Sequence, residues 1–121
     1  MRYKDKHFLE SISLALTGLW VAFIRERHLQ AHVLITVIVV ILGWWSTLSW
    51  HEWIVLILVI GLVLVTELLN TAIELTVDLF TRQQKLRAKL AKDVAAGAVL
   101  VATVVAIVIG GLLFYNKWVG H

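Results

Sequence analysis

The amino-acid sequence predicts an all-α membrane protein, in which one amphipathic surface helix precedes three membrane-spanning helices. Of its 121 residues, 60% are hydrophobic and the mean hydropathy is +0.88, whereas soluble domains are about 45–50% apolar. These residues gather in three apolar segments, each close to the roughly 20 residues that cross a bilayer core. The chain has no cysteine, which excludes disulfides and thiolate metal sites. We expect a single domain over residues 1–121.

The first expected helix covers about residues 8–25. Its apolar residues recur at helical spacing, while its polar residues lie off that stripe, which is typical of a helix in the plane of the membrane interface. The apolar stripe contains Phe8, Ile12, Leu16, Leu19, Trp20 and Phe23. The three spans are expected at about residues 29–48, 53–75 and 95–115. A Trp-rich connection over 44–53 predicts a tight hairpin at the level of the lipid headgroups.

Basic residues predict the orientation of these spans. Ten of the eleven Lys and Arg residues precede the first span or lie in the polar connection 81–92, and only Lys117 lies on the other side. Because cytoplasmic segments carry an excess of Lys and Arg, the N-terminus and this connection are expected in the cytoplasm. The basic residues accompany no nucleic-acid motif, so anionic lipid headgroups are their simplest partners.

Four polar residues interrupt the second span on one helical face: Glu67, Asn70, Glu74 and Asp78. At ~100° per residue the three carboxylates fall within roughly 40° of one another, with Asn70 on their flank. A charged side chain at the centre of a span costs roughly 2.5–3.5 kcal/mol to insert. This polar stripe is therefore the candidate active site, and a polar network that only holds helices together is the alternative.

The stripe descends from the apolar zone toward the cytoplasm over about 16 Å between Glu67 and Asp78. Glu67 is the deepest carboxylate and the candidate general base. The two shallower carboxylates could share Mg²⁺, which prefers oxygen ligands and often binds one or two carboxylates together with phosphates.

Glu26 lies at the cytoplasmic mouth of the first span. It is either a further metal-facing carboxylate or a surface charge paired with Arg25 or Arg27. His28 and His32 share a helical face, but no third ligand of matching type is evident, so zinc is not expected.

Lys92 and Asp93 precede the third span. They are either a helix cap with a solvated lysine or a phosphate-binding pair assisted by the amides of the helix start. The sequence has no P-loop, Rossmann or protein-kinase glycine motif, so those nucleotide folds are excluded.

Two motifs together, E-x-x-N-x-x-x-E-x-x-x-D from Glu67 and A-K-D-x-A-A-G from Ala91, resemble the signature of the small bacterial integral-membrane diacylglycerol and undecaprenol kinases. The resemblance covers nearly the whole chain. It implies a homotrimer in the bacterial plasma membrane that transfers the γ-phosphoryl group of MgATP to a lipid alcohol at the cytoplasmic face. The stretch from Glu26 to His32 looks more like the undecaprenol kinase branch.

The resemblance also implies a role for individual residues. It makes Glu67 the catalytic base, with Asn70 beside it at the lipid substrate, and makes Glu26 and Glu74 the ligands of Mg²⁺. The nucleotide-contacting positions that it implies are Glu26, Glu74, Asp78, Gln83, Gln84, Lys85, Lys92 and Asp93.

We therefore expect a lipid kinase that acts on undecaprenol or, as the alternative, on diacylglycerol. A small proton or cation transporter would need polar partners in the outer half of the spans, and residues 55–65 offer none beyond Gly61. A membrane subunit without chemistry would leave the paired motifs unexplained.

Overall fold

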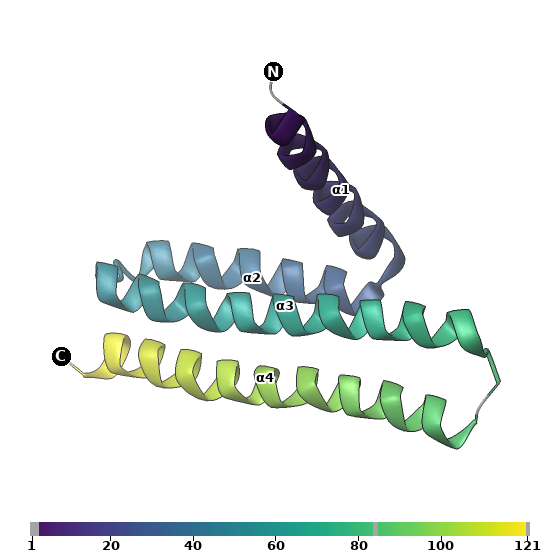
Figure 1. Cartoon of the computed structure of the whole chain (residues 1–121). Coiled ribbons are helices and arrows are strands. Elements are labelled where there is room, and N and C mark those ends of the chain that lie inside the picture. The colour runs from purple at the N-terminus through teal and green to yellow at the C-terminus, as the bar shows by residue number, and fades with distance from the viewer. Residues whose placement is uncertain (1–2, 84, 121) are drawn as a thin grey trace.

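The computed structural model describes residues 3–83 and 85–120, and these form four α-helices: α1 (Tyr3–Arg25), α2 (Arg27–Trp45), α3 (Trp50–Phe80) and α4 (Leu86–Val119). The predicted all-α class is thus confirmed. Helices α2, α3 and α4 lie side by side, whereas α1 leaves this layer at a steep angle (Figure 1). Helix α3 lies between the other two and packs most extensively on α4.

The bend between α1 and α2 is centred on Glu26, whose backbone is extended (φ −103°, ψ 112°). Gln30, one turn into α2, spans this bend. Its side-chain amide donates to the carbonyl of Phe23 at 2.8 Å and to that of Ile24 at 3.3 Å. Because the last carbonyls of a helix have no partner within it, these bonds satisfy the end of α1 and hold the angle between the two helices.

The turn between α2 and α3 is closed by two helix-capping motifs. Thr47 has a positive φ of 53°, and the amides of Thr47 and Leu48 donate to the carbonyls of Trp44 and Gly43, which is the Schellman arrangement. Helix α3 then begins with a capping box, in which the Ser49 side chain accepts from the Glu52 amide and the Glu52 side chain accepts from the Ser49 amide. These motifs explain why the hairpin is short.

The helices do not end where the apolar segments end. Helix α2 stops at Trp45, α3 runs on to Phe80, and α4 already begins at Leu86, ahead of the apolar residues 95–115. Hydropathy marks the length of chain that prefers lipid, whereas the backbone hydrogen bonds of a helix continue into the aqueous region. The polar connection is consequently limited to residues 81–85, of which Gln84 lies outside the described residues.

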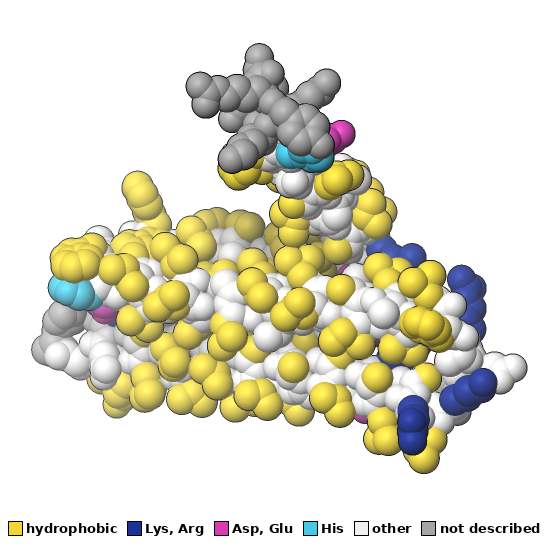
Figure 2. All heavy atoms as spheres, in the orientation of Figure 1, with side chains coloured by type: hydrophobic (Ala, Val, Ile, Leu, Met, Phe, Trp, Pro, Cys, Tyr) yellow, Lys and Arg dark blue, Asp and Glu magenta, His cyan; other side chains and the backbone are white. Residues whose placement is uncertain are grey.

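Few of the described side chains are buried, and the core between α2, α3 and α4 is made of Leu48, Leu56 and Val59 with the partly buried apolar residues around them. Most large apolar side chains face outward. Figure 2 shows hydrophobic side chains over the visible face of the three-helix layer, with Lys and Arg gathered at the end where α3 passes to α4. An apolar exterior of this kind suits a lipid environment or other protomers.

All four helices are long and apolar enough to cross a membrane, α1 included. Their mean hydropathies are 1.5 for residues 7–25 of α1, 1.7 for α2, 2.5 for α3 and 2.7 for α4. Helix α1 is the least apolar, and it alone is set at an angle to the others (Figure 1). Its position in the membrane interface stays a prediction.

Gly43 allows the end of α2 to approach α3 closely. A Cβ added there would lie 2.9 Å from Cη2 of Trp53 and 3.0 Å from Cδ1 of Leu48. We expect Gly43→Val to lower the free energy of unfolding by about 1–3 kcal/mol, because the added methyl groups displace the indole. Thermal unfolding in detergent measures this change. Gly18→Ala is the control, since a Cβ at Gly18 meets no atom within 4 Å, and an equal loss in both variants would contradict the close-approach explanation.

Candidate active site

Glu67 is the buried carboxylate of the described structure, with only 3% of the residue exposed. It lies near the middle of α3, and the buried residues Val63 and Thr71 lie one turn before and one turn after it on the same face. The hydroxyl of Thr71, also buried, donates to the backbone carbonyl of Glu67 at 3.1 Å. A buried carboxylate is expensive unless it has partners, so its surroundings show how it is tolerated.

His32 of α2 is the polar neighbour of this carboxylate. Its Nε2 lies 3.4 Å from Oε2 of Glu67, and the two side chains are 20% and 4% exposed. Oε2 makes no hydrogen bond of good geometry, so the contact is close without being a completed hydrogen bond. The sequence placed His32 on a helical face with His28 but gave no sign that it meets Glu67. Only the packing of α2 on α3 brings them together.

Asn70 and Glu74 form the next part of the polar stripe toward the α3–α4 connection. The Asn70 amide donates to Oε1 of Glu74 over 3.4 Å, a long contact, and Oδ1 of Asn70 is buried without a hydrogen-bond partner. Both residues are half-buried. As the sequence predicted, Glu67, Asn70 and Glu74 lie along one side of α3. Two of their buried oxygens, Oε2 of Glu67 and Oδ1 of Asn70, have no hydrogen-bond partner.

Asp78 joins α3 to α4 through Lys92. Nζ of Lys92 lies 2.7 Å from Oδ1 of Asp78, with about a third of each side chain exposed. Arg25 and Arg82 border the same hollow, together with Leu75 and Leu79. Three cations thus surround one carboxylate at the mouth of the bundle, and this excess of positive charge suits a polyphosphate.

Asp93 does not cap a helix, and the capping interpretation of the Lys92–Asp93 pair is wrong. Helix α4 begins at Leu86 with Lys85 at its N-cap, so both residues lie two turns inside it. Asp93 pairs instead with Lys89, one turn earlier, at 2.7 Å on an exposed surface. The prediction failed because the polar residues of the first two turns of α4 were assigned to the connection that precedes the helix.

Glu26 and the α3–α4 connection lie at the rim of the molecule. The Glu26 carboxylate is 4.0 Å from Nε of Arg25, which is the pairing that the surface-charge interpretation described. Gln83 and Lys85 are exposed, and the Gln83 amide donates to the Thr81 hydroxyl at 3.0 Å. Gln84 lies outside the described residues, so its predicted role has no structural counterpart here.

No group of three or more His, Cys, Asp or Glu side chains among the described residues is arranged to hold a metal ion. Glu26 and Glu74 nevertheless offer carboxylate oxygens, and Glu74 makes only one long contact with Asn70. Mg²⁺ usually retains several waters and takes one or two protein carboxylates together with substrate phosphates. The donor chemistry of these two residues fits that ion.

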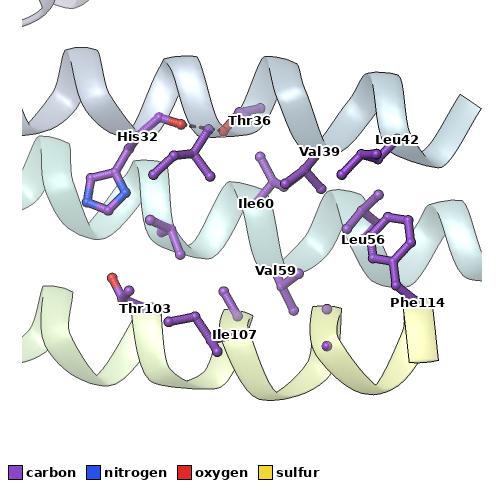
Figure 3. A pocket seen from close by; sticks show the side chains of 15 residues that line it. His32, Thr36, Val39, Leu42, Leu56, Val59, Ile60, Thr103, Ile107 and Phe114 are labelled. Carbon is purple, nitrogen blue, oxygen red and sulfur yellow. Dashed lines mark hydrogen bonds between the residues drawn. The ribbon is translucent and has the colours of Figure 1, made fainter. Parts of the chain in front are cut away.

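An apolar groove runs along the three-helix layer from His32 toward the far end of α4. Figure 3 shows His32 and Thr36 toward one end and Leu42, Leu56 and Phe114 toward the other. Gly110 and Gly111 line its α4 side, where a Cβ added to either would meet no atom within 4 Å. His32 therefore belongs both to the groove and to the surroundings of Glu67.

The chain matches known proteins along most of its length. The family described as prokaryotic diacylglycerol kinase matches residues 13–114. Undecaprenol kinase of Bacillus subtilis is 44% identical over 116 residues, covering 96% of this chain and 94% of that protein. Diacylglycerol kinase of Pseudomonas aeruginosa is 34% identical over 100 residues, covering 83% of this chain and 81% of that protein.

A further diacylglycerol kinase, from Synechocystis, is 40% identical over 108 residues, which cover 88% of this chain and 62% of that protein. These three relatives are one undecaprenol kinase and two diacylglycerol kinases, and the sequence identity is higher with the undecaprenol kinase of Bacillus subtilis than with either diacylglycerol kinase. The sequence resemblance is thereby confirmed. The chain belongs to the prokaryotic diacylglycerol kinase family of membrane-embedded lipid kinases.

Proposed function

We propose that this protein transfers the γ-phosphoryl group of ATP to undecaprenol at the cytoplasmic face of the bacterial plasma membrane. The observation that carries the proposal is a buried carboxylate, Glu67, inside an apolar helix of a chain that is 44% identical to an undecaprenol kinase. Diacylglycerol is the alternative acceptor, since two of the relatives are diacylglycerol kinases.

In this proposal α2, α3 and α4 cross the membrane and α1 lies at the cytoplasmic interface. The gathering of Lys and Arg at the α3–α4 end of the layer supports this orientation (Figure 2). The acidic stripe then faces the cytoplasm, with Glu67 at the depth of a lipid hydroxyl and Asp78 near the water. The apolar groove beyond His32, whose lining runs to Phe114, would contact part of the hydrocarbon chain.

Glu67 is the general base in the proposed reaction. Its carboxylate takes the proton of the lipid hydroxyl while the hydroxyl oxygen forms a bond to Pγ, and the bond between Pγ and the bridging oxygen breaks, so that ADP leaves with the electron pair. Asn70, one turn along the same face, would hold the hydroxyl oxygen by donating the side-chain N–H that it does not give to Glu74. A site of this kind works mainly by positioning the reactants and neutralising charge.

The nucleotide is proposed to bind at the rim, where Lys92 and Arg25 supply positive charge near Asp78. Gln83, Gln84 and Lys85 in the connection and Asp93 on α4 complete the contacts that we assign to ATP. Glu26 and Glu74 would hold Mg²⁺, which neutralises phosphate charge when bound. Lys92 would exchange its bond to Asp78 for one to a phosphate oxygen.

The working unit is proposed to be a homotrimer with shared sites. A single protomer leaves most of its large apolar side chains exposed. Glu26 contacts Arg25 rather than the polar stripe, so a neighbouring protomer is the natural source of a second carboxylate beside Glu74. Closed cyclic assemblies of this kind are common among homo-oligomers.

The direct test is phosphorylation by purified protein in micelles with labelled ATP, Mg²⁺ and either undecaprenol or diacylglycerol. We expect label in undecaprenyl phosphate at a kcat/KM at least about tenfold that for diacylglycerol, a difference of roughly 1.4 kcal/mol in transition-state binding. A higher value for diacylglycerol would assign the alternative acceptor. Absence of transfer to either lipid alcohol would refute the kinase proposal.

A further inference from the structure

We infer that His32 is the positioning residue of the general base, a role that rests on the proposed function of Glu67. The imidazole holds one carboxylate oxygen, Oε2, and thereby directs the other, Oε1, toward the hydroxyl of the lipid alcohol. The two residues come from different helices, His32 from α2 and Glu67 from α3, and their side chains lie 3.4 Å apart.

Burial makes such a partner necessary. Glu67 is 3% exposed, and its Oε2 has no hydrogen-bond partner of good geometry in the described structure. A glutamate side chain has three rotatable bonds, so a carboxylate without a fixed contact samples several orientations, which lowers the fraction aligned for proton transfer. The imidazole of His32 is the side chain whose donor lies close enough to restrict that movement.

The His32–Glu67 contact is within reach of a hydrogen bond. The distance of 3.4 Å between Nε2 and Oε2 is somewhat long, and catalytic hydrogen bonds often tighten only when substrate is bound. An imidazole with its proton on Nε2 can donate to Oε2 and leaves Oε1 free to accept the proton of the lipid hydroxyl. His32 also lines the apolar groove (Figure 3), so its ring lies where the hydrocarbon chain of the substrate is proposed to bind.

His32→Leu and His32→Gln separate positioning from packing. Leu fills a similar volume without a donor, whereas the side-chain amide of Gln carries N–H donors at the distance of Nε2 from the backbone. We expect His32→Leu to lower kcat for undecaprenol about 10- to 100-fold, by analogy with the loss of residues that orient the ligands of a metal, with KM changed less than about twofold. We expect His32→Gln to retain kcat within about fivefold of the wild type.

His28→Leu is the matched control, because His28 is one turn earlier on the same face of α2 but exposed; its kcat should equal that of the wild type. The double variant Glu67→Gln/His32→Leu tests whether His32 acts through Glu67. We expect the same residual kcat as in Glu67→Gln alone, since residues that act as one unit are not additive. Size-exclusion chromatography of each variant in detergent follows assembly.

Three results would overturn the inference: wild-type kcat in His32→Leu, an equal loss in His32→Gln and His32→Leu, or a further loss of kcat in the double variant. A failure of the proposed function looks different, because the wild type would then phosphorylate no lipid alcohol under any condition.

Discussion

Glu67→Gln is expected to lower kcat for phosphorylation of undecaprenol about 10²- to 10⁴-fold, which is the contribution of a positioned general base. The substitution keeps the size and the hydrogen-bonding shape of the side chain but removes its ability to take a proton. Because the amide is neutral, its burial beside His32 costs less than that of the carboxylate. The variant should therefore assemble as the wild type does, and KM for ATP should change less than about threefold.

Glu52→Gln provides the matched control on the same helix. Glu52 belongs to the capping box at the start of α3, and Gln serves that motif as well as Glu. We expect wild-type kcat from this control. Kinetics with labelled ATP, combined with size-exclusion chromatography in detergent, distinguish lost chemistry from lost assembly. A Glu67→Gln protein that turns over within threefold of the wild type would remove Glu67 from the role of base.

The sequence predicted the fold class well because a membrane restricts the structures that are possible. In lipid every backbone polar group must be satisfied within the segment, so long apolar segments become helices, and α2, α3 and α4 follow directly. Hydropathy alone could not predict the residues at which these helices begin and end. The end of α2 depends on Thr47 adopting a positive φ, and the start of α4 at Leu86 depends on residues that favour helix although they are polar.

The polar stripe was also predictable, because it depends only on the period of one helix. Glu67, Asn70 and Glu74 share a side of α3 as expected. Contacts between helices were not predictable in this way, since they depend on which faces pack together. The approach of His32 to Glu67 and the pairing of Lys92 with Asp78 are both contacts between helices. The sequence showed that these residues are present, but not that they meet.

Glu74→Gln is expected to raise the Mg²⁺ concentration that gives half-maximal activity by about tenfold or more, corresponding to roughly 1.4 kcal/mol of lost binding. An amide oxygen remains a ligand for Mg²⁺, but it carries no charge to attract the ion. Because Glu74 accepts one long contact from Asn70, the substitution should disturb the fold little. Activity measured against Mg²⁺ at saturating lipid, with ATP held in fixed proportion to the ion, gives the shift.

Glu67→Gln and Glu74→Gln should therefore impair the reaction in different ways, although the two residues lie only two turns apart on the same face of α3. High Mg²⁺ should restore much of the kcat of Glu74→Gln, because added ion compensates for weaker binding by mass action. It should restore nothing to Glu67→Gln, where the missing function is proton transfer. Glu52→Gln should keep the wild-type Mg²⁺ dependence. If Glu74→Gln also kept it, Glu74 would be excluded as a ligand, and its contact with Asn70 would be its whole role.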